Sequence, residues 1–368
     1  MKATILQENL NKSLSFVTKL VSSRTQLPIL SNVLLETESG YLKVSTTNLE
    51  TSMSFWVGAS VEETGAITVP AKLLSEIVAS FSHEKIILST DGFNLKLICG
   101  DSESTLSGID AKEFPPLPQT GQQKSIILDK HVLDNGLPFV LISASQDESR
   151  PLLTGIKFAA KEEHLEMVAT DGYRLSVKEL PQIKGMEEGL VISAKAMADV
   201  FRLAIEEKAE NIALYISKDK NQAVFKLEKA MVATRIIEGE YPVYAKIIPS
   251  TFTTKSIFNK EEMIRAVKLA SVYAREAANI LKFKVTKETI TISASSAQIG
   301  ENKTTISAKT QGEGGEIAFN ARFLSDLLNV FPEEDVVFEM NGNLSPGVFH
   351  PVKDETYLHI IMPVRIQG

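Results

Sequence analysis

The chain has 368 residues, of which 43% are hydrophobic and 23% charged, a balance typical of globular proteins that excludes a disordered or fibrous one. Its formal charge of −7 excludes a protein that binds nucleic acid over its whole surface, but not one with a locally basic face. A single cysteine, Cys99, excludes an internal disulfide. No apolar run approaches the roughly 18 residues of a membrane span, and the first residues lack a secretory signal, so we expect a cytoplasmic protein.

In chain order, three segments begin with a strand pattern and continue with a helix pattern. They start at Lys2, Lys124 and Lys255, and their sequences are KATILQENLNKSLSFVTKLV, KSIILDKHVLDNGLPFVLIS and KSIFNKEEMIRAVKLASVYA. A second pattern recurs at a similar spacing from Ile67, Leu190 and Ile317, as ITVPAKLLSEIVASF, LVISAKAMADVFRLA and IAFNARFLSDLLNVF. Apolar residues at i, i+3, i+4 and i+7 predict an amphipathic helix in each of these.

Alternating strand patterns lie between the helices. LKVSTTNLETSMSFWV in the first copy corresponds to LEMVATDGYRLSVKEL in the second. The repeats predict an α+β fold with three tandem domains, each with two helices packed on antiparallel sheets. The polar, Pro- and Gly-containing connections LPQTGQQK and IPSTFTTK place the domains at residues 1–120, 121–250 and 251–368.

Basic residues recur on the predicted helices of all three copies. Lys12 and Lys19 are seven residues apart, and so are Lys195 and Arg202, which places each pair near one helix face. Any amphipathic helix carries Lys and Arg on its solvated face, but the repetition favours a surface for duplex DNA, with no aromatic platform for single strands. The candidate DNA-binding residues are Lys12, Lys19, Arg24, Arg150, Lys195, Arg202, Arg265, Lys268 and Arg275.

Four strings carry a resemblance to a known family. They are SSRTQLPIL with Arg24, VATDGYRL at residues 168–175, EYPVYAKIIP at 240–249, and MPVR at 362–365. With these strings the chain resembles, over its whole length, the bacterial beta sliding clamps of DNA polymerase III. The resemblance implies a head-to-tail homodimer that forms a six-domain ring around duplex DNA. It implies a processivity factor that is not an enzyme and needs no cofactor.

The resemblance also implies a hydrophobic pocket for short peptide motifs between the second and third domains. Tyr173 and Lys246 depart from the histidine and arginine that the family often has, and lysine cannot form the planar bidentate fork of arginine. The end of the chain is equally typical of an ordinary core strand. The implied pocket residues are Leu153, Thr170, Gly172, Tyr173, Arg174, Leu175, Pro242, Lys246, Ile247, Pro346, Ile360, Ile361, Met362, Pro363, Val364 and Arg365.

The implied partners are double-stranded DNA, a second copy of the chain, the DNA polymerase III alpha subunit, a clamp-loader ATPase, and other polymerases and repair proteins that carry short clamp-binding motifs. For the dimer interface, Val272 and Tyr273 are candidates on the third domain and Leu106 on the first. An apolar-aromatic pair on a helix is also typical of a core. We expect no membrane partner.

Patterns for enzymatic chemistry are missing from the sequence. There is no nucleotide-binding loop, and the five histidines have no metal-ligand spacing, so we expect no metal site. Asp171 is better explained by an Asx-type turn before Gly172 than by a general base. Two alternatives remain, an α+β enzyme with a site assembled across domains and a three-domain scaffold unrelated to DNA. Neither alternative explains why the domain is repeated in tandem.

Overall fold

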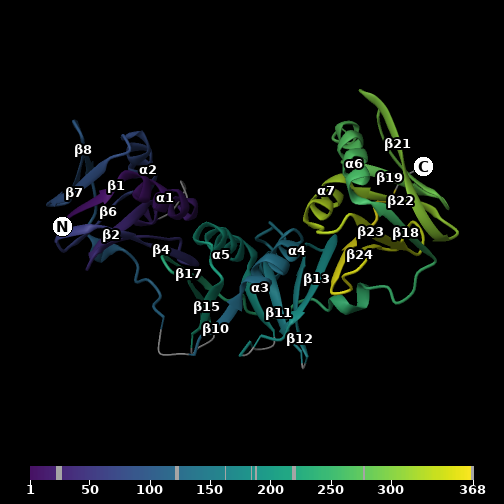
Figure 1. The fold of residues 1–368 in the computed structure, drawn as a ribbon, viewed down its shortest axis with the longest axis horizontal. Helices are drawn as coiled ribbons and strands as arrows, with labels where there is room; N and C mark the ends of the chain where they lie inside the picture. The colour runs from purple at the N-terminus through teal and green to yellow at the C-terminus, as the bar shows by residue number, and fades with distance from the viewer. Residues whose placement is uncertain are drawn as a thin grey trace. The chain divides into compact units, whose positions relative to one another are not determined.

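The structure is a computed structural model that describes residues 1–21, 27–120, 124–161, 163–183, 185–186, 189–217, 221–276 and 278–365. The chain forms two compact units. Figure 1 labels many of their helices and strands. Unit 1 comprises Met1–Asp129 and Asp199–Ile236, and unit 2 comprises Lys130–Ala198 and Ile237–Gly368. Both contain helices packed on antiparallel sheets, which confirms the predicted α+β class. No helix in these ranges is long and apolar enough to cross a membrane.

Unit 1 contains a five-stranded sheet with the order β5-β1-β7-β8-β9 and an eight-stranded sheet with the order β10-β15-β16-β17-β4-β3-β2-β6. The strands are β1 (Lys2–Leu6), β2 (Asn32–Glu38), β3 (Tyr41–Thr47), β4 (Thr51–Gly58), β5 (Ser60–Glu63), β6 (Ala66–Pro70), β7 (Lys85–Asp91), β8 (Asn94–Cys99), β9 (Ser102–Ser107), β10 (Ile126–Asp129), β15 (Asn211–Ile216), β16 (Gln222–Lys226) and β17 (Ala230–Arg235). The helices of unit 1 are α1 (Gln7–Val17) and α2 (Ala71–Ser80), with 3-10 turns η1 (Thr18–Leu20), η2 (Pro28–Ser31) and η3 (Ala111–Glu113). Helix α5 (Ala194–Glu207) begins in unit 2 and continues into unit 1 from Asp199.

Unit 2 contains a twelve-stranded sheet with the order β14-β11-β12-β13-β25-β24-β23-β18-β21-β20-β19-β22. The strands are β11 (Gly155–Ala160), β12 (His164–Thr170), β13 (Arg174–Pro181), β14 (Leu190–Ser193), β18 (Thr254–Asn259), β19 (Ile280–Val285), β20 (Thr289–Ser296), β21 (Gly300–Gly312), β22 (Gly315–Asn320), β23 (Asp335–Met340), β24 (Gly347–Pro351) and β25 (Tyr357–Ile361). Its helices are α3 (Lys130–Asn135), α4 (Leu137–Leu141), α6 (Lys260–Ala274) and α7 (Ala321–Val330), with 3-10 turns η4 (Pro151–Thr154) and η5 (Tyr244–Ile247).

A strand followed by a helix recurs as the sequence predicts. β1 leads into α1, β6 into α2, β14 into α5, β18 into α6 and β22 into α7. The middle copy differs, because its first helix is divided into α3 and α4 at Gly136. Pro138 lies in the first turn of α4, where proline is tolerated because its missing N–H would have no partner inside the helix.

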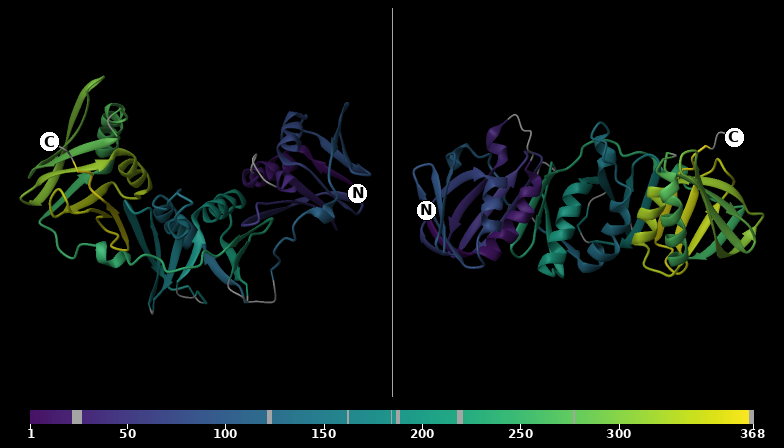
Figure 2. Two further views of the ribbon diagram at one scale, coloured as in Figure 1. Left: turned by 180° about the vertical axis from the view of Figure 1, so that it is seen from behind. Right: turned by 90° about the horizontal axis from the view of Figure 1, so that it is seen from above.

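Pairs of helices lie side by side on the sheets, α1 with α2 in unit 1 and α6 with α7 in unit 2 (Figure 2). The asparagines that precede α6 and α7 stabilise the helix starts. Asn259 accepts a hydrogen bond from the N–H of Glu262, and Asn320 accepts one from the N–H of Arg322.

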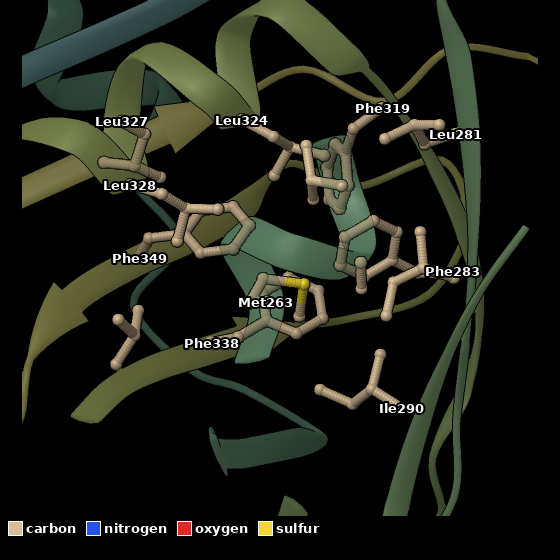
Figure 3. Packing of buried hydrophobic residues seen from close by; sticks show 14 of the residues in the cluster. Met263, Leu281, Phe283, Ile290, Phe319, Leu324, Leu327, Leu328, Phe338 and Phe349 are labelled. Carbon is tan, nitrogen blue, oxygen red and sulfur yellow. The ribbon is translucent and has the colours of Figure 1, made fainter. Parts of the chain in front are cut away.

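A large core lies in unit 2, between α6, α7 and the sheet. Met263 and Leu324 contribute from the two helices, and a group of phenylalanines fills the space beneath them (Figure 3). Phe319 and Phe338 meet edge to face, with ring centroids 5.8 Å apart, an arrangement that aromatic rings favour.

The two units do not coincide with the three predicted domains. Strands of the predicted central domain contribute to both large sheets, since β10 and β15–β17 belong to one and β11–β14 to the other. The predicted boundaries at 120/121 and 250/251 therefore stay a prediction.

Candidate functional site

A tight turn joins β12 to β13 and carries four of the predicted pocket residues. The carboxylate of Asp171 accepts hydrogen bonds from the N–H groups of Tyr173 and Arg174, both at 2.9 Å, which is the predicted Asx-type turn. Gly172 has a φ of +91°, in the left-handed region that favours glycine. The turn projects Tyr173 into solvent, with 63% of the residue exposed.

Arg174, the last residue of this turn, is buried. Its Nε donates to Asp171 at 3.1 Å, its Nη1 donates to Asp326 of α7 at 2.7 Å, and the guanidinium lies 4.4 Å from the Phe323 ring. Paired buried arginines hold their partners in a fixed geometry. Arg174 therefore fixes the turn against α7. Sequence reasoning missed Asp326 and Phe323.

Beside the turn, a small apolar cluster lies on one face of the sheet. Leu175 of β13 is the register partner of Ile360 of β25, so both side chains point to the same face. The buried members of this cluster are Val168, Leu175, Val177, Val348 and Ile360, and Tyr241, Tyr244, Ile248, Phe252 and Leu358 pack against it. The predictions included Leu175 and Ile360. Apolar and polar residues alternate along β12, β13 and β24, and this pattern could have identified Val168, Val177 and Val348 as buried.

Other predicted pocket residues are exposed, unlike the buried members of this cluster. Pro242, Lys246 and Ile247 are exposed, and Lys246 and Ile247 belong to η5. Met362 is 36% exposed, and its N–H donates to the carbonyl of Tyr173 at 2.8 Å, which joins the end of β25 to the turn.

The remaining predicted pocket residues do not belong to this apolar cluster. Ile361 lies on the opposite face of β25, inside the main core of unit 2, because neighbouring strand residues alternate. Leu153 and Pro346 are half-buried, and Thr170 is buried at the end of β12. Pro363 and Val364 are half-buried and Arg365 is exposed, and the N–H of Val364 donates to Ala318 of β22 at 2.8 Å.

A buried polar chain lies where β13 pairs with β25. Ser176 is hydrogen-bonded to Ser143 and to Nδ1 of His359, both at 2.8 Å, and the Tyr357 hydroxyl donates to the carbonyl of Phe139. Burial lowers the pKa of His359 to about 3 and raises that of Tyr357. Within the described part of the chain, Nε2 of His359 has no hydrogen-bond partner.

The predicted basic residues that the structure describes are all exposed, but they differ in pairing. Lys12 forms an ion pair with Glu206, Arg202 pairs with Asp199, and Arg150 pairs with Asp147 at 2.9 Å. Lys19 lies 5.1 Å from the ring of Phe16. Arg24 lies outside the described residues. Lys195 of α5, Arg265 and Lys268 of α6, and Arg275 just after α6 complete the set.

The predicted interface residues fall into two groups. Val272 is 53% exposed on α6, and Leu269, which sequence reasoning missed, is 49% exposed one turn earlier. Tyr273 is half-buried against the core of unit 2, and Leu106 is buried in unit 1.

Two hollows also indent the units, and Lys12 lines the first of them. One in unit 1, of about 1330 Å³, is lined by Trp56 and by residues 114–120 of a connection. The other, of about 540 Å³ in unit 2, contains the buried ion pair between Lys178 and Asp354, whose Nζ and Oδ2 are 2.6 Å apart. Beside the second hollow, His164, Glu166 and Glu179 come together, although their sequence spacing predicted no metal site.

Comparison with known proteins gives matches in all three predicted domains. The family models of the DNA polymerase III beta subunit match residues 1–118 with the N-terminal domain, 127–243 with the central domain and 245–365 with the C-terminal domain. A beta sliding clamp from Synechococcus elongatus is 31% identical, with full coverage of both chains, and one from Staphylococcus aureus is 28% identical over 99% of both.

Solved structures agree with these matches. The DNA polymerase sliding clamp from Bacillus subtilis is 27% identical with a TM-score of 0.91, and each chain covers the other fully. The sliding clamp from Bartonella birtlesii, bound to griselimycin, is 26% identical with a TM-score of 0.93 and the same coverage.

These matches confirm the predicted three clamp domains and the non-catalytic role, because the family's function is polymerase processivity. The chain therefore belongs to the DNA polymerase III beta subunit family, the beta sliding clamps.

Proposed function

We propose that two copies of this protein join head to tail into a ring that encircles duplex DNA without sequence preference and tethers the replicative polymerase. The observation that supports this most is the set of three clamp-domain matches in tandem along one chain. Closed rings arise when a head-to-tail interface repeats through a rotation that closes. The ring operates in the cytoplasm and is opened by a separate clamp-loader ATPase.

DNA contact in this proposal is electrostatic. Lys and Arg side chains that neutralise phosphates hold duplex DNA without reading its bases, and base contacts would stop sliding. Among the described residues, no ion pair involves Arg265 or Lys268 of α6, whereas Lys12 and Arg202 have carboxylate partners. We therefore expect the α6 pair to contribute more to retention.

The decisive experiment loads the intact protein onto closed circular DNA with its clamp loader and follows retention at moderate salt. Arg265→Glu with Lys268→Glu should shorten the lifetime of the loaded complex by about tenfold or more, since each phosphate contact contributes to the steep salt dependence of binding. Lys12→Glu with Arg202→Glu should shorten it less.

A matched control reverses two exposed charges elsewhere in unit 2. Lys282→Glu with Lys284→Glu, both on β19, should leave the lifetime unchanged. Thermal melts must show that all variants are folded. Equal lifetimes for the α6 pair and the β19 pair would contradict the assignment of α6 to the DNA surface.

We further propose that partner proteins dock a short motif on the apolar cluster around Leu175 and Ile360. Leucine or phenylalanine anchors suit a preformed apolar surface bordered by a few polar groups. The exposed edge of this surface includes Tyr173, Ile247 and Met362. The partners are the DNA polymerase III alpha subunit, the clamp loader, and other polymerases and repair proteins.

Two residues set this surface apart within the family. Tyr173 presents a phenol ring where an imidazole ring is common, and Lys246 presents an ammonium group where a guanidinium group is common. An ammonium group cannot form two parallel hydrogen bonds to one carboxylate. An acidic residue in a motif should therefore bind Lys246 less strongly than it would bind an arginine. Motifs with an additional apolar residue facing Tyr173 should rank higher.

A further inference from the structure

Three potential metal ligands meet on one face of β12 and β13. His164 and Glu166 are two residues apart on β12, so their side chains share a face. Glu179 of β13 is the register partner of Glu166 and lies on the same face. One ligand atom from each of the three lies within 4.8 Å of the other two.

The contacts of Glu166 lie mainly at one of its carboxylate oxygens. The Tyr244 hydroxyl donates to Oε2 of Glu166 at 2.6 Å, and Nζ of Lys161 lies 3.8 Å from the same oxygen. Oε1 lies 3.8 Å from Nε2 of His164, too far for a hydrogen bond. Glu179 places a second carboxylate directly opposite, and like charges in that position are destabilising.

The imidazole of His164 adds a further detail of the same group. Among the residues that the structure describes, its Nε2 is shielded from solvent and has no hydrogen-bond partner, while 35% of the side chain is exposed. A buried polar atom without a partner costs free energy, and such atoms are uncommon in native proteins. An ion between His164 and the two carboxylates would satisfy this atom and neutralise the carboxylate pair together.

We propose that His164, Glu166 and Glu179 form a Zn²⁺ site whose coordination is completed by solvent. Zinc binds imidazole nitrogen and carboxylate oxygen at about 2.0–2.2 Å, so its ligand atoms lie roughly 3–4 Å apart. Glu179 is exposed and can rotate to close the remaining distance. Mg²⁺ and Ca²⁺ favour sites made of oxygen alone, so the histidine selects against them.

A similar pair in the same unit serves as an internal control. Nε2 of His350 lies 3.7 Å from Oε2 of Glu339, almost the same separation. Lys255 pairs with Glu339 at 3.0 Å, and across the described ranges no third ligand joins that pair. His350→Gln therefore removes a comparable histidine from a place that has no metal geometry.

The experiment uses the full chain, freed of metal by chelation, and titrates it with Zn²⁺ against a chromogenic chelator. Wild type should bind one ion per chain, and excess Mg²⁺ should not compete. His164→Gln and Glu179→Gln should each weaken binding by at least about tenfold, since even residues that only support ligands have effects of that size. His350→Gln should bind as wild type does. Zn²⁺ should also raise the melting temperature of wild type but not of His164→Gln.

The proposal is overturned if wild type binds no Zn²⁺ at millimolar concentration, or if the two ligand variants bind as tightly as wild type. It is equally overturned if His350→Gln loses as much affinity as His164→Gln. Melting curves in chelator identify any variant that fails to fold. Glu179→Gln provides the test in that case, because Glu179 is exposed and its replacement removes a like-charge contact.

Discussion

His359 lies fully buried where β13 pairs with β25, and its imidazole is held in the neutral form. Nδ1 is hydrogen-bonded to Ser176, and burial together with the charge of Arg174 lowers the pKa of His359 to about 3. An unfolded histidine has a pKa of about 6.5. Between these two values the unfolded chain binds a proton that the folded chain does not, so protonation favours unfolding.

We expect the free energy of unfolding to decrease as the pH falls below about 6.5, with His359 contributing up to about 1.4 kcal/mol per pH unit. This contribution is fully present above pH 6.5 and is lost progressively towards pH 3. Urea titrations at pH 7.5, 6.0 and 5.0 measure this change in the free energy of unfolding. His359→Gln should be less stable at pH 7.5 but should show a shallower decrease. Parallel pH profiles for the two proteins would contradict this assignment.

Single residues also show where sequence-based prediction ends. Leu175 and Ile360 were predicted from strings that resemble a family, and the Asx-type turn at Asp171 followed from its neighbouring glycine. The contact between Arg174 and Asp326 joins residues 152 positions apart, and nothing local in either segment indicates it. The same holds for Ser176 and His359, which only the pairing of β13 with β25 brings together.

Among the elements, the segment after β25 and the turn after β12 are joined by the hydrogen bond from the N–H of Met362 to the carbonyl of Tyr173. Periodicity predicted most helices well, because a buried face repeats every three to four residues. It did not predict the break between α3 and α4, where apolar residues continue past Gly136 and conceal the interruption.

Removing the segment after β25 should weaken binding of a labelled clamp-binding peptide. Fluorescence titration of the variant lacking residues 362–368 should show little binding, since Met362 and its bond to the turn are lost. Ile247→Ala should cost about 1–2 kcal/mol, or a factor of roughly 5–30 in affinity, through lost apolar contact. Ile87→Ala in unit 1 is the matched control, because Ile87 is 37% exposed and Ile247 is 42% exposed. Equal affinities for all four proteins would exclude this surface as the docking site.

For the whole molecule, we expect assembly to use the exposed apolar residues of α6. Leu269 and Val272 lie one turn apart, and about half of each is exposed, which is unfavourable in an isolated chain. An interface that covers them gains the transfer free energy of both side chains. The tandem arrangement of domains was predictable from sequence because three elements repeat at one spacing. For the partner surface, Val272 was among the predicted residues but Leu269 was not, because an exposed apolar residue on a helix resembles a core residue in sequence.

The solution mass of wild type should be about 80 kDa, twice the 40.4 kDa of the chain. Leu269→Asp with Val272→Asp should reduce it to that of a single chain, because burying two carboxylates in an apolar interface is strongly unfavourable. Ile205→Asp is the control, since Ile205 is also exposed on a helix. Light scattering after size-exclusion chromatography measures all three. A wild-type monomer would count against the ring itself.

Two strand pairings described above have a further consequence. β17 pairs with β4 from Ala230 opposite Phe55 to Thr234 opposite Thr51, and β13 pairs with β25 over a similar length. Each pairing joins segments that are distant along the chain, so backbone hydrogen bonds hold them together independently of the peptide that connects them. For β4 and β17, the covalent path that includes residues 114–120 thus keeps the two strands at high local concentration rather than supplying their cohesion. We expect such a protein to tolerate division into separately made fragments that reassemble.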